Sequence, residues 1–184
     1  CIAVNGTFDD CQRLMKETFS DLDYKEKYQL GAVNSVNWAR VLAQIVYYGY
    51  ASLKMPAAAQ FSVPTGNFGN VFAAYLAQRM GFPIDKLIVA TNDNDILARF
   101  FVTGEYALGQ VHQTLAPAMD IQVASNFERF LYYYFEQDSQ RLNAFMSDFA
   151  VTGRATLGAA PDTAFFEAVA IDQPQTLSVM RSIK

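Results

Sequence analysis

The stretch Phe61-Ser62-Val63-Pro64-Thr65-Gly66-Asn67-Phe68-Gly69-Asn70, followed by Val71-Phe72-Ala73-Ala74-Tyr75-Leu76-Ala77, decides the fold of this chain. A short apolar strand runs into a glycine-containing turn, and the turn runs directly into an apolar-periodic helix. Glycine has no Cβ, so backbone N–H groups in such a turn can approach a bound group closely. The first turn of the helix adds unpaired N–H groups and about half a positive charge. The sequence therefore predicts an anion-binding turn, with a phosphate as the natural ligand.

This motif differs from the best-known phosphate-binding patterns. No lysine follows it, as one does in G-x-x-x-x-G-K-[ST], and Gly66 and Gly69 do not make G-x-G-x-x-G. The turn also contains no Lys or Arg, so its backbone would carry the binding. On pattern alone, an ordinary tight strand-to-helix turn is an equally good interpretation.

Strands and helices alternate around this turn. Strands are predicted at residues 61–63 and 87–91, and helices at residues 70–80 and 95–102. The second strand is a continuous apolar run, which is typical of buried parallel strands. The order favours right-handed crossovers and an α/β fold, an open parallel sheet with flanking helices. Because ligands bind beyond the carboxyl ends of such strands, we expect residues 64–66 and 91–94 to face one crevice.

The other elements are predicted from periodicity and capping residues. A short strand at residues 2–4 precedes a helix that begins at Thr7 or Asp9 and ends near Phe19, with Asp9 and Asp10 as helix-start acids. Cys11 is expected to be a small buried residue. Further helices are predicted at residues 21–28, 38–53, 126–136, 140–151, 162–170 and from 174 onward.

Composition limits the possible partners. The chain has 184 residues, of which 52% are hydrophobic, and this is enough to form one sizeable core. Its net charge is −4. It shows neither the clustered Lys and Arg of a nucleic-acid surface nor an apolar run of about 18 residues, as a membrane span needs. We therefore predict that the protein binds no nucleic acid and no membrane. Because the sequence has no signal-peptide pattern, we also predict a cytoplasmic location. Cys1, Cys11 and His112 fit no metal-ligand or catalytic-triad pattern, so no metal is expected.

Five segments, in order and spanning about residues 1–131, carry a family resemblance. They are Asn5-Gly6-Thr7-Phe8-Asp9-Asp10-Cys11-Gln12, Asn34-Ser35-Val36-Asn37-Trp38-Ala39-Arg40, Pro64-Thr65-Gly66-Asn67-Phe68-Gly69-Asn70, Ala90-Thr91-Asn92-Asp93-Asn94-Asp95 and Ala118-Met119-Asp120-Ile121. Together they resemble threonine synthase, a pyridoxal 5′-phosphate enzyme of the tryptophan-synthase-β-like fold. The resemblance implies a carbon–oxygen lyase that converts O-phosphohomoserine and water to threonine and phosphate, the last step of threonine biosynthesis.

The resemblance also implies roles for named residues. It assigns the 5′-phosphate of the cofactor to the backbone N–H groups of Gly66, Asn67, Phe68, Gly69 and Asn70. It places Ser35 and Arg40 at the phosphate of the substrate. Arginine suits this role because its planar guanidinium can meet two phosphate oxygens at once.

One part of the family pattern is missing. The Schiff-base lysine of the family lies in a Phe-Lys-Asp block, which this sequence does not contain. We therefore expect an internal portion of the enzyme, with no catalytic residue in this chain and no activity alone. Residues 1–30 are interpreted as the end of the smaller domain, and residues 31–184 as part of the larger, cofactor-phosphate-binding domain.

Two alternatives stay open at this point. One is another pyridoxal-phosphate-dependent lyase or dehydratase of the same fold, and the other is a non-catalytic phosphate-binding module. The sequence does not give the oligomeric state.

Overall fold

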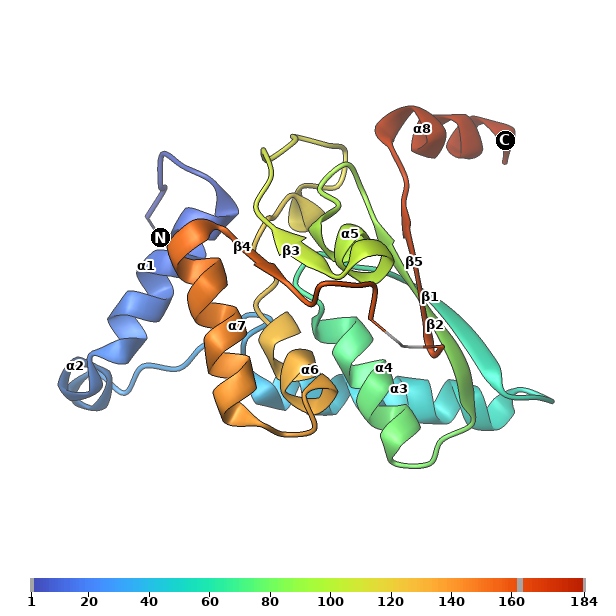
Figure 1. Cartoon of the computed structure of the whole chain (residues 1–184), viewed down its shortest axis with the longest axis horizontal. Helices are drawn as coiled ribbons and strands as arrows, with labels where there is room; N and C mark the ends of the chain where they lie inside the picture. Colours follow the sequence, from blue (N-terminus) through green and yellow to red (C-terminus); the bar gives the residue numbers. More distant parts are fainter. Residues whose placement is uncertain (1, 162–163, 184) are drawn as a thin grey trace.

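A parallel sheet positions the predicted turn. The computed structural model describes residues 2–161 and 164–183. Its three-stranded parallel sheet has the order β1 (Ala59–Pro64), β2 (Ile84–Thr91), β5 (Phe166–Ala170) (Figure 1). Helix α4 (Gly69–Arg79) connects β1 to β2, and α5 (Ile96–Thr103) follows β2. This order confirms the predicted α/β fold with a parallel sheet and flanking helices.

One face of the sheet contributes to the core. The register places Phe61 beside Leu87 and Leu87 beside Phe166, and all three side chains belong to the hydrophobic core or pack against it. Helix α3 (Trp38–Lys54) packs along α4. From α3 the ring of Tyr48 meets Phe61 edge-on, with ring centroids 5.0 Å apart. The helices therefore bury the apolar alternate residues of the strands.

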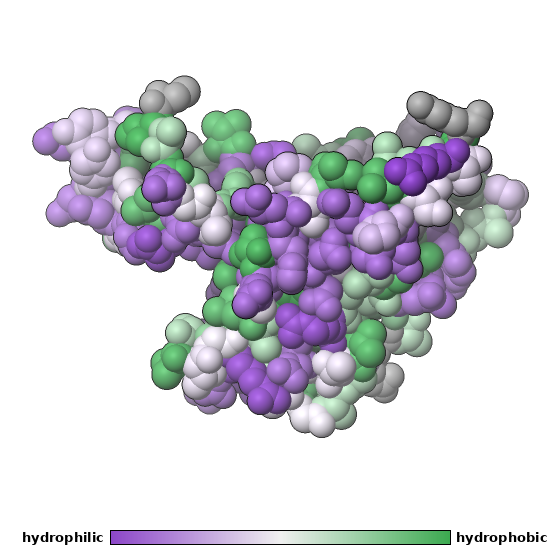
Figure 2. All heavy atoms as spheres, turned by 90° about the horizontal axis from the view of Figure 1, so that it is seen from above, coloured by the Kyte–Doolittle hydropathy of each residue, from purple (hydrophilic) through white to green (hydrophobic). Residues whose placement is uncertain are grey.

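The remaining elements surround this centre. Strands β3 (Glu105–Ala107) and β4 (Arg154–Thr156) form a separate antiparallel pair. The remaining helices are α1 (Phe8–Ser20), α2 (Leu22–Lys27), a 3₁₀ helix at Pro117–Met119, α6 (Phe127–Tyr134), α7 (Ser139–Thr152) and α8 (Gln173–Ser182). Figures 1 and 2 both show α1 and α2 standing out at one end of the molecule. Within residues 2–161 and 164–183, no helix combines the length and apolar character needed to cross a membrane.

Helix α1 begins where the sequence predicts. The Thr7 hydroxyl accepts a hydrogen bond from the Asp10 N–H at 3.4 Å, and the Asp10 carboxylate accepts one from the Thr7 N–H at 2.8 Å. This reciprocal pair is a capping box. The hydrogen bond from the Thr7 backbone is the largest of the effects that hold the pKa of Asp10 below its usual range.

Three local predictions were wrong. Residues 162–170 do not form the predicted helix, because β5 occupies Phe166–Ala170; residues 162 and 163 lie outside the described part. The free edge of β2 supplies a parallel hydrogen-bond ladder, which outweighs the helix propensity of the alanines there. Residues 2–4 form no strand, since no partner strand pairs with them in the described structure. Cys11 is exposed, because Gln12 is the α1 side chain that turns inward.

The side chain of Phe68 anchors the turn in the core. Its ring is fully buried, with centroids 5.3 Å from Phe127, 5.5 Å from Phe130 and 6.0 Å from Phe101. Its backbone has a left-handed φ of 60°, which costs a non-glycine residue on the order of 1 kcal/mol. Burial of a Phe side chain contributes about 1.5–3 kcal/mol, so burial outweighs this strain. The ring thereby fixes where β1 ends and α4 begins.

Two glycines that follow helices provide a test of the packing. Gly104 has a φ of 78°, and a Cβ there would lie 1.8 Å from the carbonyl oxygen of Ala159. Gly81 has a φ of 95°, but a Cβ there would meet no heavy atom within 4 Å. Gly104→Ala should therefore lower the free energy of unfolding by about 3 kcal/mol or more, and Gly81→Ala by about 1 kcal/mol. Urea denaturation measures both losses, and equal losses would contradict the contact between Gly104 and Ala159.

Candidate functional site

The turn between β1 and α4 opens into a cavity of about 350 Å³. The cavity is lined by Ser35, Arg40, Gln44, Pro64, Thr65, Gly66, Asn67, Gly69, Asn70, Ala118 and Met119. The two segments that the sequence suggested separately, around Ser35 and around Gly66, therefore lie together. Phe68 does not line the cavity, because its ring lies in the core.

The backbone of the turn leaves several donors available. The Thr65 N–H donates to the Ala90 carbonyl at 2.9 Å, and the Phe68 N–H donates to Thr65 Oγ1 at 3.1 Å. Within the described residues, the N–H groups of four other turn positions have no intramolecular acceptor: Gly66, Asn67, Gly69 and Asn70. The last two belong to the first turn of α4, where the helix dipole is positive. Such an arrangement suits an anion.

The two glycines of the turn permit close packing rather than an unusual φ. A Cβ at Gly66 would lie 3.1 Å from the Cα of Met119, and a Cβ at Gly69 would lie 3.1 Å from the Asn126 side-chain nitrogen. Gly66 therefore lets the 3₁₀ helix close one side of the cavity. Gly69 leaves room for the amide of Asn126.

The side chain of Asn70 is held by helix α3. The Tyr48 hydroxyl donates to the Asn70 side-chain oxygen, and the Asn70 side-chain nitrogen donates to the Tyr47 hydroxyl. Burial raises the pKa of Tyr48 above its usual range, so its hydroxyl stays protonated and able to donate. With its side chain engaged, Asn70 presents its backbone N–H to the cavity.

Arg40 lies in the first turn of α3. The side chain of Asn37 caps this helix by accepting from the Ala39 N–H at 2.9 Å. One Arg40 nitrogen, Nη1, donates to the Val33 carbonyl at 3.1 Å, which leaves further guanidinium donors for the cavity. Ser35 lies in the preceding loop and lines the same cavity.

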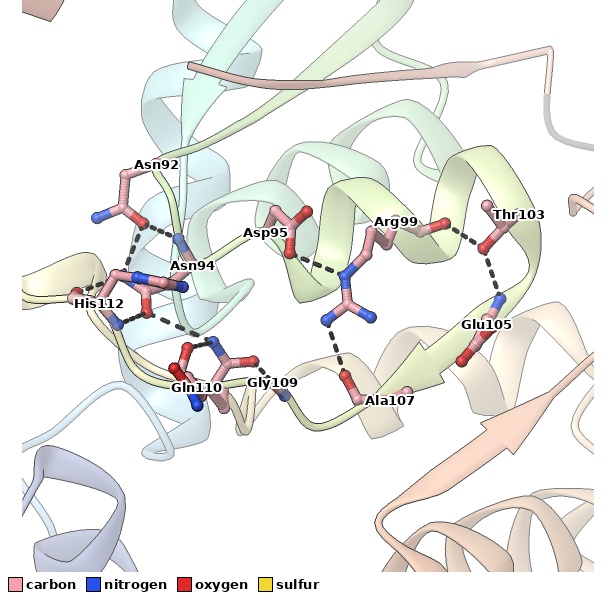
Figure 3. Close-up of polar contacts among 11 residues, drawn as sticks. Asn92, Asn94, Asp95, Arg99, Thr103, Glu105, Ala107, Gly109, Gln110 and His112 are labelled. Carbon is pink, nitrogen blue, oxygen red and sulfur yellow. Dashed lines mark hydrogen bonds and ion pairs between the residues drawn. The ribbon is translucent and has the colours of Figure 1, made fainter. Parts of the chain in front are cut away.

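The carboxyl end of β2 does not line this cavity, contrary to the expectation that residues 91–94 face the same crevice as residues 64–66, but it supports a segment that does. Figure 3 shows Asn94 beside His112, where its side chain donates to the His112 carbonyl and accepts from the His112 N–H, both at 2.8 Å. The Asp120 carboxylate accepts from Asn92 at 2.7 Å and from the Thr114 N–H at 2.8 Å. These bonds hold residues 112–120, which include the lining residues of the 3₁₀ helix. The asparagines after β2 therefore support the loop that lines the cavity.

Residues 64–66 were expected at the crevice, and the Thr65 hydroxyl also holds the turn by accepting a hydrogen bond from the Phe68 N–H. Sequence reasoning gave no site role to three other lining residues: Gln44, Ala118 and Met119. Gln44 interrupts the apolar run of α3, and such an isolated polar residue indicates a polar surrounding.

The structure also contains a larger hollow of about 530 Å³. Its lining includes Arg129 and Tyr132 of α6 and Trp38 at the start of α3. We place the candidate site at the smaller cavity, because the free N–H groups of the turn belong to its lining.

The chain is similar to proteins named threonine synthase. The chain is 42% identical to threonine synthase of Pseudomonas aeruginosa over 188 aligned positions, which cover 99% of this chain and 40% of the relative. It is 50% identical to threonine synthase of Schizosaccharomyces pombe over 72% of this chain and 29% of the relative. A crystal structure of pyridoxal-phosphate-bound threonine synthase from Brucella melitensis matches 98% of this chain and 40% of that chain, with 43% identity and a TM-score of 0.86.

The chain belongs to the threonine synthase family. Threonine synthase from Escherichia coli matches with a TM-score of 0.76 at 30% identity, covering 99% of this chain and 38% of that chain. No family model matches the chain. The chain thus spans between 29% and 40% of the length of the threonine synthases compared here.

Asp9 links α1 to the loop that follows the 3₁₀ helix. Its Oδ2 atom accepts from the Gln122 N–H at 2.9 Å, while its buried Oδ1 atom has no partner within the described residues. Burial raises the pKa of Asp9, and the hydrogen bonds from Gln122 and Val123 offset only part of this effect. The folded protein therefore holds a proton on Asp9 more tightly than the unfolded chain does.

Asp9→Asn should raise the melting temperature at neutral pH. Above the raised pKa, the carboxylate is charged in the folded and the unfolded state, so the folded protein bears the full cost of burying it. Below 3.8, the usual pKa of an aspartate, both states are protonated and the difference between variant and parent should vanish. Melting curves from pH 3 to 8 measure this. Asp10→Asn is the matched control and should lower stability at neutral pH, because the pKa of Asp10 is lowered.

Proposed function

We propose that this chain supplies the phosphate-binding part of a threonine synthase, which converts O-phosphohomoserine and water to threonine and phosphate. The observation that carries the proposal is the single cavity shared by the turn at Gly66–Asn70 and by Ser35 and Arg40. Two anion-binding elements at one cavity suit a phosphorylated cofactor beside a phosphorylated substrate. The pyridoxal-phosphate-bound relative supports this choice of cofactor.

The residues divide into two roles. The free N–H groups of Gly66, Asn67, Gly69 and Asn70 hold the 5′-phosphate of pyridoxal phosphate, while Phe68 contributes its buried ring to the shape of the turn. When bound, the cofactor supplies the electron sink that the reaction needs. Ser35 and Arg40 bind the phosphate of the substrate, and the guanidinium stabilises its charge as it leaves.

The domain division and the location belong to the same proposal. We infer that residues 1–30 form the end of a smaller domain and residues 31–184 part of a larger one, in a cytoplasmic enzyme. The position of α1 and α2 at one end of the molecule supports this (Figure 1). Helix α1 reaches the rest through polar contacts, such as the hydrogen bond from Gln12 Nε2 to Asn67 Oδ1 at 3.2 Å.

A dehydratase of the same fold is the nearest alternative. A dehydratase acting on an unphosphorylated amino acid has no substrate phosphate to bind, whereas Arg40 supplies a cation at the same cavity as the turn. The phosphorylated substrate is therefore favoured.

Arg40→Ala tests the substrate assignment. In the full-length enzyme, kcat/KM for O-phosphohomoserine should fall by about 10²-fold, the loss expected for a charge-assisted hydrogen-bonding group worth about 3 kcal/mol. The affinity for pyridoxal phosphate, measured by absorbance titration, should stay unchanged. Arg40→Lys keeps the charge but not the planar fork, so its loss should be intermediate.

Gly69→Asp tests the cofactor assignment. The new carboxylate carries the same sign of charge as the 5′-phosphate and adds bulk beside the Asn126 side chain, so cofactor binding should be lost. Retention of normal cofactor affinity in this variant, or loss of cofactor in Arg40→Ala, would reverse the two assignments.

A further expectation concerns residues 1–184 alone. Since the sequence lacks the Phe-Lys-Asp block, we propose that this chain releases no phosphate from O-phosphohomoserine when pyridoxal phosphate is added. A colorimetric phosphate assay measures this. Turnover above background would show that the lysine of that block is not required.

A further inference from the structure

Asn126 lies between the two phosphate-binding elements. It is fully buried, with 0% of its surface exposed, and it stands at the N-terminus of α6. Asparagine is a common helix-capping residue, yet this side chain makes no capping hydrogen bond to its own helix. A buried amide that does not cap must be satisfied elsewhere, because an unpaired polar group in the interior is costly.

The amide nitrogen of Asn126 bridges the two elements directly. It donates to the Ser35 carbonyl at 3.0 Å and to the Asn67 carbonyl at 3.1 Å. The backbone N–H of Asn126 donates to the same Asn67 carbonyl at 3.1 Å. One side chain thus holds both the proposed substrate-phosphate loop and the proposed cofactor-phosphate turn.

Arg129 fixes the orientation of this amide. Its Nη1 donates to the Asn126 side-chain oxygen at 2.5 Å, and its Nη2 donates to the Val36 carbonyl at 2.7 Å. The guanidinium lies over the Trp38 ring, with its carbon 5.4 Å from the ring centroid. Because a guanidinium only donates, the Asn126 oxygen must face Arg129, and the NH₂ group must face the two carbonyls.

The turn is shaped to accept Asn126. A Cβ at Gly69 would lie 3.1 Å from the Asn126 side-chain nitrogen, so glycine there leaves the space that the amide occupies. Since a peptide group is planar, holding the Asn67 carbonyl also sets the direction of the Phe68 N–H, which donates to Thr65 Oγ1. The amide of Asn126 therefore influences the course of the whole turn.

We propose that Asn126, oriented by Arg129, is a positioning residue that sets the separation between the cofactor-phosphate turn and the Ser35–Arg40 segment. This proposal rests on the proposed function. It goes further by linking the affinities of the two ligands through one side chain that touches neither of them. Loss of the Asn126 amide should therefore weaken the affinities for both the cofactor and the substrate. Loss of a residue that binds only one of these ligands should weaken only that affinity.

Asn126→Asp is the decisive variant. It keeps the shape of the side chain and an acceptor for Arg129, but it turns a carboxylate oxygen toward the carbonyls of Ser35 and Asn67 in place of two donors. In the full-length holoenzyme, the Kd for pyridoxal phosphate by absorbance titration and the KM for O-phosphohomoserine should each rise at least tenfold. At saturation with both, kcat should change by less than threefold.

Two further variants make the test independent of folding. Arg129→Met removes the group that orients the amide and should raise both constants in the same direction, by a smaller factor. Phe149→Leu is a matched stability control in α7, where the Phe149 ring packs 4.5 Å from the centroid of Tyr106. It should lower the melting temperature and leave both constants unchanged.

A double variant tests the coupling itself. Once Asn126→Asp has displaced the Ser35–Arg40 segment, adding Arg40→Ala should lower kcat/KM by a smaller factor than it does in the parent enzyme. Full multiplication of the two factors would overturn the positioning role.

The outcomes separate the two proposals. If Arg40→Ala leaves kcat/KM unchanged, the proposed function of the cavity fails. If Arg40→Ala lowers kcat/KM as expected while Asn126→Asp alters neither the Kd for pyridoxal phosphate nor the KM, or only one of them, the positioning proposal is wrong and the function stands. An effect of Phe149→Leu equal to that of Asn126→Asp would also overturn the positioning role, because general loss of stability would then explain it.

Discussion

The structure depends on one buried ring in an uncommon backbone conformation. Phe68 takes a left-handed φ between a strand and a helix, and its side chain fills the centre of an aromatic core. The chain can then reverse from β1 into α4 without exposing that ring. The backbone on either side of Phe68 faces the other way, toward the cavity. The same turn therefore contributes a side chain to the core and backbone groups to the cavity.

The rest of the site is arranged around this turn by contacts to backbone carbonyls and to amide side chains. Asn126 and Arg129 hold carbonyls in two loops, and Asn94 holds both backbone groups of His112 (Figure 3). Such contacts fix the path of the main chain. They depend little on which side chain the contacted residue carries, because they are made to its backbone. This explains why the irregular parts of the cavity wall, at Ser35 and at residues 65–67, have a defined shape.

The sequence predicted the parts of the fold that local pattern determines. The turn after β1, the continuous apolar run of β2 and the capped start of α1 each carry a local signal, and each was found. The strand at Phe166–Ala170 could not be predicted in this way. Its alanines favour a helix locally, and only the free edge of β2, distant in sequence, makes it a strand. For the cavity, the motif residues were predicted, but Asn126 was not, because its partners Ser35 and Asn67 lie far away in the chain.

Helix α3 is joined to the first turn of α4 at both Tyr47 and Tyr48, through the side chain of Asn70. These contacts tie the helix that carries Arg40 to the helix that follows the glycine turn. The two helices are therefore expected to move as one rigid body during any conformational change of the enzyme. A motion of these helices as one body would leave both contacts to Asn70 intact. Helix α1 lies outside this pair of helices, and it meets the turn through Gln12 and the loop after the 3₁₀ helix through Asp9.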